Sequence, residues 1–329
     1  MKRARDVAIL VLLSFLCVLG KYITNDQRQY VNSFYGDKFS VDEDYPDEVD
    51  VYSYADLNES LGIPQHYKNT FYPDKLFLAI IHTIPSKLHH VEKTRQTWCN
   101  PQYQNEFGMK CIFVLVRETV EKKNMTGIVS SLNNTYHDLY YIEMPNLKEH
   151  WFTLQQKNVN AYILAKTLFP DYLFYSRVDD EIIVTVDTLA DLLVSLPKKN
   201  TVVGEFVRHR PNKNVKNKYY DPLAINIKKY FFFPAGYLSI WSSDIIDFIA
   251  SWENYYTIAP SSLEDPGFGH FLYKYYTTTN NKLYFVTPEK WGGNTGTHYG
   301  DYMVFHDQRG RLNQTKILER RIADGHFVN

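Results

Sequence analysis

Apolar residues along this chain fall into two kinds of stretch, and the two kinds alternate. Short uninterrupted apolar runs are typical of buried strands, and they occupy residues 76–81, 111–116, 139–142 and 172–175. Stretches in which apolar residues recur every three or four positions are typical of helices, and they occupy residues 88–98, 118–132 and 154–168. Strands that alternate with helices over this length predict an α/β fold, with a mostly parallel sheet and helices on both of its faces.

The second half of the chain continues this alternation with shorter elements. A serine at position 242 or 243 is expected to cap a helix that runs to residue 252, and Gly236 stands in an apolar segment where the backbone can approach a ligand. The other predicted elements are helices at 187–196 and 268–276, strands at 202–207 and 283–286, and apolar segments at 231–238 and 304–306.

Three adjacent acidic residues, Asp179, Asp180 and Glu181, follow the apolar run at 172–175. Neighbouring carboxylates repel one another and are costly to remove from water, and a multivalent cation offsets that cost. Mg²⁺ and Mn²⁺ typically bind one or two carboxylates together with substrate phosphates. Ligands of parallel α/β sheets bind at the carboxyl ends of the strands. The pattern therefore predicts a divalent metal held for a phosphate-bearing substrate; the alternative is a solvated acidic turn between two strands.

Composition adds limits on the class of protein. The 329 residues suffice for one large α/β domain or two domains, and a hydrophobic content of 44% provides a sizeable core. The net charge of −1 does not suggest a nucleic-acid binder. Residues 37–60 hold nine acids and one base, which is typical of a solvated stem or linker.

The N-terminus resembles a targeting segment. Lys2, Arg3 and Arg5 precede an apolar run of fourteen residues at 7–20, which is short for a spanning helix of about 20 residues. A cleaved signal peptide and a membrane anchor both stay open, and either one predicts the secretory pathway. Four sequons agree with that compartment, beginning at Asn58, Asn124, Asn133 and Asn313.

Three cysteines are too few for a disulfide scaffold or a zinc ribbon. Cys17 lies in the apolar N-terminal run, which leaves Cys99 and Cys111. In an oxidising lumen a pair this close could form a bridge, and we expect its role to be structural.

Two further features carry charge near predicted elements. Glu264 and Asp265 stand directly before the helix predicted at 268–276, and His306 ends the last apolar segment. A loop after the strand predicted at 202–207 is basic, and it is either solvated or placed beside an anionic donor or acceptor; its basic residues are Arg208, Arg210, Lys213, Lys216 and Lys218.

The order and spacing of several motifs, from Leu76 to His306, resemble the β-1,3-galactosyltransferase family of inverting glycosyltransferases (glycosyltransferase family 31). The strongest matches are Arg95-Gln96-Thr97-Trp98 with the family's Arg-x-Thr-Trp, residues 177–184 with Lys-x-Asp-Asp-Asp-Val-Phe-Val, and residues 264–269 with Glu-Asp-Val-x-x-Gly. Residues 234–237 are similar to its Gly-Gly-Gly-Tyr turn, and residues 136–139 and 154–157 match more loosely.

The resemblance implies a Golgi membrane protein of the single-pass type II class, with its catalytic domain in the lumen. Its parts are a cytosolic tail at 1–6, a signal-anchor at 7–20, an acidic stem at 21–72 and a Rossmann-like GT-A glycosyltransferase domain at 73–329. Such an enzyme uses Mn²⁺ or another divalent cation. It moves galactose or an N-acetylhexosamine from a UDP-sugar to a glycan on a glycoprotein or glycolipid, in a β-1,3 linkage.

The resemblance also implies roles for single residues. Asp265 would be the base that activates the acceptor hydroxyl. The other implied site residues are the metal ligands Glu181, Asp179 and His306 and the donor-binding residues Asp179, Asp180, Arg95 and Lys157.

Alternatives remain for several of these residues. Arg95 could instead pair with a structural carboxylate, and His306 could be a core residue, with His298 as the weaker candidate ligand. Glu264 is expected to interact with the N-terminus of the following helix, and Trp98 to lie in the core.

Two departures from the family pattern bear on function. Glu181 stands where the family has a third Asp, which changes the reach to a metal, and Ala235 replaces a Gly on the acceptor side.

The alternative function is a catalytically silent chaperone or lectin of the secretory pathway on the same fold. A metal-dependent phosphohydrolase is disfavoured because the chain has no His-rich metal motif.

Overall fold

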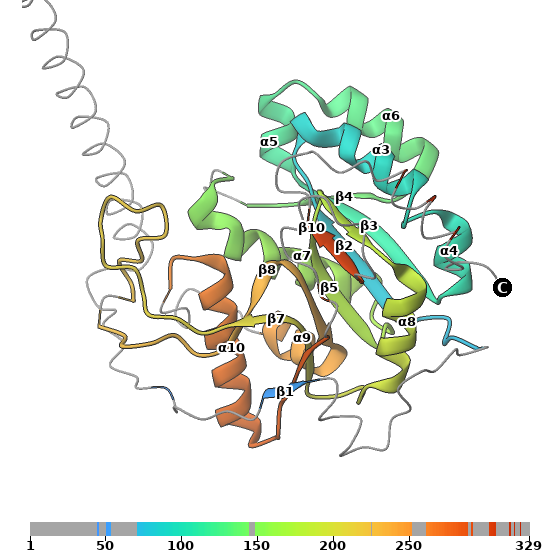
Figure 1. The fold of residues 1–329 in the computed structure, drawn as a ribbon. Helices are drawn as coiled ribbons and strands as arrows, with labels where there is room; N and C mark the ends of the chain where they lie inside the picture. Colours follow the sequence, from blue (N-terminus) through green and yellow to red (C-terminus); the bar gives the residue numbers. More distant parts are fainter. Residues whose placement is uncertain are drawn as a thin grey trace, which may run out of the picture.

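A computed structural model describes residues 45, 51–53, 71–144, 149–224, 226–251, 261–288, 291 and 303–306, together with positions 316, 319 and 323. At its centre lies an eight-stranded sheet (Figure 1). In spatial order its strands are β1 (Val51–Ser53), β9 (Tyr284–Thr287), β7 (Thr201–Val207), β8 (Phe233–Ser242), β5 (Phe174–Asp179), β2 (Phe77–His82), β3 (Met109–Val116) and β4 (Leu139–Ile142).

All neighbouring strands of this sheet are parallel except β8, which runs antiparallel to both β5 and β7. The predicted α/β class with a mostly parallel sheet is therefore confirmed. In the register of β2 against β5, His82 stands opposite Asp179, and both are the last residues of their strands. The first acid of the triplet is thus fixed at the carboxyl edge of the sheet.

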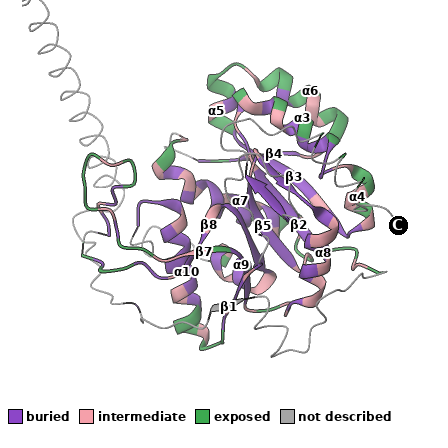
Figure 2. Ribbon diagram, in the orientation of Figure 1, coloured by how far each residue is buried: buried purple, intermediate pink, exposed green. Residues whose placement is uncertain are grey.

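Helices cover both faces of the sheet, as predicted. Alternate residues of β2 enter two separate hydrophobic clusters, since Ala79 packs with α3 and α8 while Ile80 packs with α7, α9 and α10. Figure 2 shows the strands buried between these layers. The helices are α3 (Leu88–Gln96), α4 (Pro101–Glu106), α5 (Arg117–Lys122), α6 (Thr126–Tyr136), α7 (Leu154–Leu168), α8 (Val186–Ser195), α9 (Ser243–Ser251) and α10 (Glu264–Thr279), with short 3₁₀ helices at η1 (Pro85–Lys87) and η2 (Trp151–Thr153).

Two predicted helices differ from the structure. The helix expected at 118–132 is two helices, α5 and α6, because Asn124 between them adopts a left-handed backbone with φ 55°. The helix expected at 268–276 begins four residues earlier, at Glu264. Pro266 is tolerated there because N–H groups in the first helical turn have no partner within the helix. Glu264 and Asp265 therefore lie in the first turn of α10 instead of before it.

Part of the range expected to form the acidic stem contributes to the fold. β1 extends the sheet beside β9. Tyr45 is buried, packs against Tyr273 at a ring distance of 4.9 Å, and shares a 2.7 Å hydrogen bond with His270.

Several expectations fall on positions outside the described residues. They are the cytosolic tail at 1–6, the segment at 7–20, Cys17, most of the stem, the sequons at Asn58 and Asn313, and His298. In the part of the chain that is described, no helix combines the length and apolar character needed to cross a membrane.

The cysteine pair forms the expected bridge. Cys99 and Cys111 are joined by a disulfide, with Cα atoms 5.9 Å apart. The bond ties the segment after α3 to β3 in the buried core.

Candidate active site

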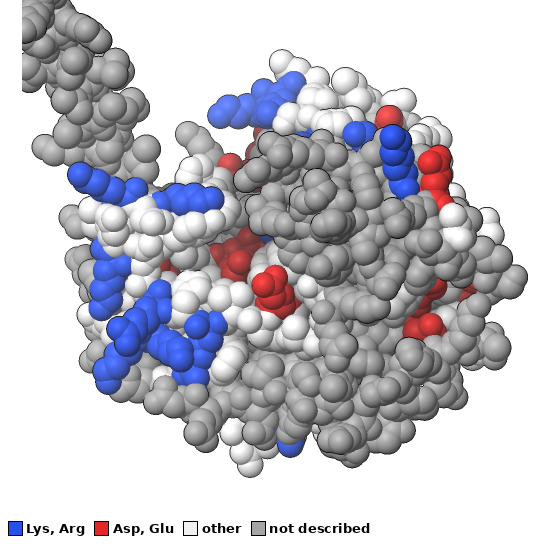
Figure 3. All heavy atoms as spheres, in the orientation of Figure 1, with Lys and Arg blue, Asp and Glu red and all other residues white. Residues whose placement is uncertain are grey.

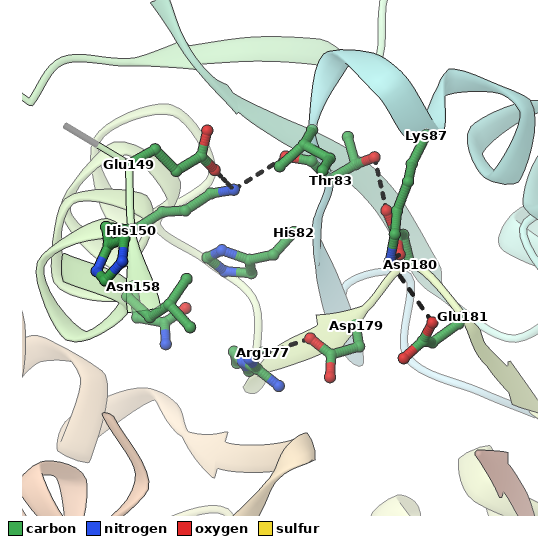
Figure 4. A pocket seen from close by; sticks show the side chains of 13 residues that line it. His82, Thr83, Lys87, Glu149, His150, Asn158, Arg177, Asp179, Asp180 and Glu181 are labelled. Carbon is green, nitrogen blue, oxygen red and sulfur yellow. Dashed lines mark hydrogen bonds and ion pairs between the residues drawn. The ribbon is translucent and has the colours of Figure 1, made fainter. Parts of the chain in front are cut away.

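A pocket of about 300 Å³ opens at the carboxyl edge of the sheet (Figure 4). Three connections build its walls: the one that leaves β2, the one that enters α7, and the turn after β5. The lining residues are His82, Thr83, Ile84 and Lys87 from the first, Glu149, His150, Leu154, Lys157 and Asn158 from the second, and Arg177, Asp179, Asp180 and Glu181 from the third.

The structure brings together the three residues expected to bind a metal. One ligand atom from each of Asp179, Glu181 and His306 lies within 4.8 Å of the other two. His306 reaches the acids because β10 (Val304–His306) pairs antiparallel with β6 (Ile182–Val184), which follows the acidic turn. Its ring also stacks on Tyr237 at 4.9 Å, so His306 is a buried residue that faces the acids.

The chemistry of this donor set fits a divalent cation. Carboxylates suit divalent ions such as Mg²⁺ and Mn²⁺, and an imidazole suits a transition metal. Donors this close can share an ion with bonds of roughly 2.0–2.6 Å. The hydrogen bond from His306, followed by the charge of Lys87, holds the pKa of Glu181 below its usual range. Glu181 is therefore ionised at neutral pH, as a metal ligand must be.

Asp180 has a different environment from its two neighbours. It is 4% exposed and accepts a 2.8 Å hydrogen bond from the Thr83 hydroxyl. The Lys87 ammonium lies 3.1 Å away, and His90 Nδ1 lies at 3.4 Å. These contacts tie the acidic turn to the connection after β2. Asp180 thus braces the pocket wall, and its expected contact with the donor stays a prediction.

Lys157, expected to bind the donor, is buried in the pocket wall. Its ammonium donates to the Thr83 carbonyl oxygen at 2.9 Å and to Glu149 Oε1 at 2.5 Å. Burial, with the charges of Lys157 and Arg177, holds the pKa of His82 well below its ordinary value, so the imidazole is neutral. Figure 4 shows Glu149, Thr83, His82 and Arg177 around the cavity.

Sequence reasoning missed His82, Thr83, Lys87, Glu149 and His150 as pocket residues. A signal existed for the first two, because they directly follow the apolar run at 76–81 and therefore stand at the carboxyl end of a strand.

Arg95 lies outside the residues that line the pocket. Its guanidinium forms two hydrogen bonds to Asp138, at 2.8 and 2.6 Å, and lies 3.9 Å from the ring centre of Tyr136. The structure thus gives Arg95 the structural partner that was its alternative. Trp98 is 1% exposed, as expected of a core residue, and its indole N–H donates to the Ile182 carbonyl oxygen at 3.0 Å.

A second group of acids also contacts or approaches Arg177. The guanidinium is 3.0 Å from Asp179 Oδ1 and 2.8 Å from Glu264 Oε1. Glu264 also accepts a hydrogen bond from Asn158. Leu263 occupies the N-cap position of α10 and makes no side-chain capping hydrogen bond, so Glu264 does not cap this helix. Glu264 follows Leu263 in the first turn, and its carboxylate turns inward to Arg177.

Asp265 is held beside Gly236. The Gly236 N–H donates to Asp265 Oδ2 at 3.0 Å, and a Cβ added at Gly236 would lie 2.1 Å from Asp265 Oδ1. The close approach that glycine permits here is therefore to the Asp265 carboxylate. Burial raises the pKa of Asp265 above its usual value, while the charge of Arg177 opposes that rise. Asp265 is thus a stronger base than an exposed aspartate when it is ionised.

Arg177 is shared by the two groups of acids, because its Nη2 lies 3.0 Å from Asp179 Oδ1 and 3.2 Å from Glu264 Oε2. Arg177 and Asn158 line both the main pocket and a narrow recess that Glu264 and Asp265 also line. The metal-type residues and the expected base therefore lie in adjoining spaces that share one buried arginine.

Comparison with solved structures found glycosyltransferases at low similarity. A glycosyltransferase involved in the glycosylation of the major capsid of PBCV-1 is 12% identical, with a TM-score of 0.34 over 75% of this chain and 99% of that one. The mannosyltransferase PcManGT from Pyrobaculum calidifontis, in complex with GDP-Man and Mn2+, is 13% identical, with a TM-score of 0.35 over 67% and 57%. At these scores the likeness supports no conclusion about the site, and no curated protein matched the chain.

The model of the Galactosyltransferase family matches residues 91–279. This match runs from within α3 through the acidic triplet to the end of α10, and it leaves out the pocket wall at 82–87 and His306. It covers more than half of the 329 residues. The α/β sheet with acids at its carboxyl edge is the GT-A arrangement expected for such enzymes. The chain therefore belongs to the galactosyltransferase family, and its class of reaction is glycosyl transfer.

Proposed function

We propose that this protein is an inverting glycosyltransferase that uses a UDP-sugar. It would move galactose or an N-acetylhexosamine to a glycan in a β-1,3 linkage. One observation supports this most: the ligand atoms of Asp179, Glu181 and His306 converge within 4.8 Å, while Asp265 lines a separate recess that shares Arg177 with the main pocket.

The metal-type residues are suited to stabilise the leaving diphosphate. Asp179, Glu181 and His306 would hold a divalent ion, and Mn²⁺ is our candidate. When bound, that ion would stabilise the negative charge that develops on the diphosphate. The Lys87 ammonium, 3.5 Å from Glu181 Oε2, adds positive charge at the same wall of the pocket.

Asp265 is suited to act on the acceptor. Asp265 would take the proton from the acceptor hydroxyl, a contribution worth about 10²–10⁴ in rate. A base separated from the donor acids favours attack on the face opposite the leaving group. One such displacement on an α-linked donor inverts the anomeric centre and gives a β linkage. Arg177 opposes protonation of Asp265 and thereby helps to keep the base ionised.

The test uses the full chain in detergent, with UDP-galactose, UDP-N-acetylglucosamine and UDP-N-acetylgalactosamine in Mn²⁺. Each donor is offered with a panel of neutral and anionic glycans, and the Asp265→Asn variant is run beside the wild type. We expect transfer from one of these donors and its loss in the variant. Wild-type protein that binds UDP but transfers no sugar would contradict the enzyme. Such a result would favour the alternative, a silent chaperone or lectin on this fold.

We also propose a Golgi membrane location, with residues 7–20 as an uncleaved type II anchor. The proposal rests on the basic residues before that apolar run and on the family. The protein should stay with membranes after alkaline extraction and keep its N-terminus near Met1. A mature N-terminus at Lys21 would contradict the anchor.

A further inference from the structure

Two large aromatic side chains form an exposed pair beside the pocket. Trp151 is 44% exposed and Tyr219 is 45% exposed, with ring centres 5.9 Å apart at 63°. The Lys218 ammonium lies 4.5 Å from the Tyr219 ring centre and 5.7 Å from that of Trp151. We call these two rings the Trp151–Tyr219 pair. They come from segments far apart in the sequence, and part of their apolar surface is exposed to solvent.

The Trp151–Tyr219 pair stands at the edge of the sheet where the acids lie. Trp151 directly follows His150, which lines the main pocket. Tyr219 belongs to the loop between β7 and β8, residues 208–232. Since β7 and β5 both run antiparallel to β8, the carboxyl end of β7 lies at the same edge as that of β5.

The loop also reaches the proposed base. The His209 ring, near the start of the loop, packs on Phe233 at the beginning of β8, and the next residue, Pro234, lines the recess that Asp265 also lines. The loop therefore extends from the neighbourhood of Asp265 to the Trp151–Tyr219 pair, along the side of the site where the acceptor would lie.

This loop is strongly basic although the whole chain has a net charge of −1. Residues 208–230 contain seven lysines and arginines and a single acid, Asp221. That acid is 1% exposed and accepts hydrogen bonds from the Tyr230 and Ser262 hydroxyls, so it does not neutralise the surface. Figure 3 shows Lys and Arg gathered on this side of the molecule, beside a hollow that contains acidic side chains.

We infer that the Trp151–Tyr219 pair and the basic loop form an acceptor subsite for a negatively charged saccharide, an inference that rests on the proposed transferase function. The C–H face of a sugar ring packs on exposed aromatic rings, which offer large apolar contact area. The exposed basic residues Arg210, Lys213 and Lys216 attract carboxylate or sulfate groups on the same saccharide. The subsite adjoins the main pocket through His150 and the recess of the proposed base through Pro234, which suits an acceptor whose hydroxyl must reach Asp265.

Binding of labelled hexasaccharides to the full chain in detergent tests the subsite without depending on turnover. The probes are a sulfated hexasaccharide, a polyuronate hexasaccharide without sulfate, and a neutral hexasaccharide of β-linked galactose. We expect the wild type to bind at least one anionic probe more tightly than the neutral probe. Trp151→Ala should weaken that binding by about tenfold, as for an aromatic anchor of an interface. Tyr276→Ala, which removes an aromatic ring 40% exposed near the far end of α10, should leave it unchanged.

The charge requirement is tested by the triple substitution of Arg210, Lys213 and Lys216 to Ser. It should abolish the preference for the anionic probe and the weakening of binding by salt. The matched control replaces three exposed lysines of other elements and connections, at positions 75, 122 and 123, by Ser and should preserve both. The sulfated and polyuronate probes decide which anionic group is recognised.

Several results would overturn the subsite. The first is equal binding of the neutral and anionic probes, and the second is unchanged binding in Trp151→Ala. The third is binding of anionic lipid vesicles that competes with the saccharides and is not weakened by Trp151→Ala. Hydrolysis of the UDP-sugar without acceptor should be the same in the wild type and in these variants. Absence of UDP-sugar hydrolysis by the wild type would count against the proposed function. The saccharide-binding measurements would still decide whether the acceptor subsite exists.

Discussion

Two buried arginines of this protein have opposite surroundings. Arg95 meets one carboxylate, Asp138, through two hydrogen bonds of 2.8 and 2.6 Å, which is the bidentate geometry of a closed structural pair. Arg177 is shared among three carboxylates, with Asp179 and Glu264 in ion pairs and Asp265 within electrostatic reach.

The difference lies in how the charges are compensated. Burial raises the pKa values of Asp179, Glu264 and Asp265, and one guanidinium opposes all three shifts. A site with more buried acid than base has a use for a bound cation and for a carboxylate of raised basicity. The Arg95 pair stabilises the fold, whereas the Arg177 group can take part in chemistry.

The largest effect is expected from Asp265→Asn. The change keeps the size of the side chain but removes the base, so kcat should fall by about 10²–10⁴. UDP-sugar affinity should change little, because Asp265 is not among the residues that would hold the metal ion and the diphosphate. Steady-state kinetics together with donor titration measure both quantities. Turnover near the wild-type value would place the base elsewhere.

Glu181→Gln should act on the donor side instead. Removing the charge of a ligand should weaken Mn²⁺ binding at least about tenfold, the lower end of the loss seen for outer-shell partners. Donor affinity should fall with it, and a chelator should abolish transfer by the wild type. Glu143→Gln, at an exposed acid paired with Arg117, is the matched control. Full activity in chelator, or in Glu181→Gln, would remove the acidic turn from the metal site.

The pH profile of kcat sharpens the role of Arg177. Asp265 acts as a base only when ionised, so the rate should fall as the pH drops through its pKa. Because burial raises that pKa, the fall should begin above the ordinary aspartate value of about 3.9. Arg177→Met removes the opposing charge and should move the fall to still higher pH. A profile that Arg177→Met leaves in place would show that this arginine does not act on the base.

The same shifts predict how stability depends on pH without metal. The folded pKa values of Asp179, Glu264 and Asp265 lie above their unfolded values. Their contribution to stability is therefore fully present below the unfolded values and is lost as the pH rises through the folded ones. Chelated protein should melt at higher temperature near pH 5.5 than near pH 8. A flat or opposite trend in thermal unfolding would contradict the raised values.

Asp138→Asn should have the smallest effect on turnover. It breaks the Arg95 pair and leaves a buried guanidinium, which costs roughly 3 kcal/mol of unfolding free energy. Turnover per folded molecule should stay near the wild-type value, as measured by denaturant unfolding and active-site titration. A large loss of kcat with unchanged donor affinity would give Arg95 a role in the chemistry after all.

Much of the fold was predictable because strong hydrophobic periodicity dominates it. The runs at 76–81, 111–116 and 139–142 became β2, β3 and β4 with shifts of at most two residues at either end. The misses arose where local signals were ambiguous. The left-handed residue Asn124 divided one helix, and the tolerance of a first turn for Pro266 extended another.

The candidate site was predictable only in part, because its motifs identify residues without their partners. The resemblance to the family implied that Asp179, Glu181 and His306 share a metal, with a core role left open for His306, and the structure brings the three together. The sharing of Arg177 between two groups of acids could not be predicted, because it depends on how α10 packs against β8. The Trp151–Tyr219 pair could not be predicted from the sequence either, because it forms only when two distant loops meet at one edge of the sheet.

The anomeric configuration of the product tests the proposed role of Asp265 most directly. If Asp265 activates the acceptor hydroxyl for a single displacement of the diphosphate, the anomeric centre must invert. NMR of the disaccharide product should then show a β linkage formed from the α-linked UDP-sugar. A product with an α linkage would contradict a single displacement with Asp265 as the base.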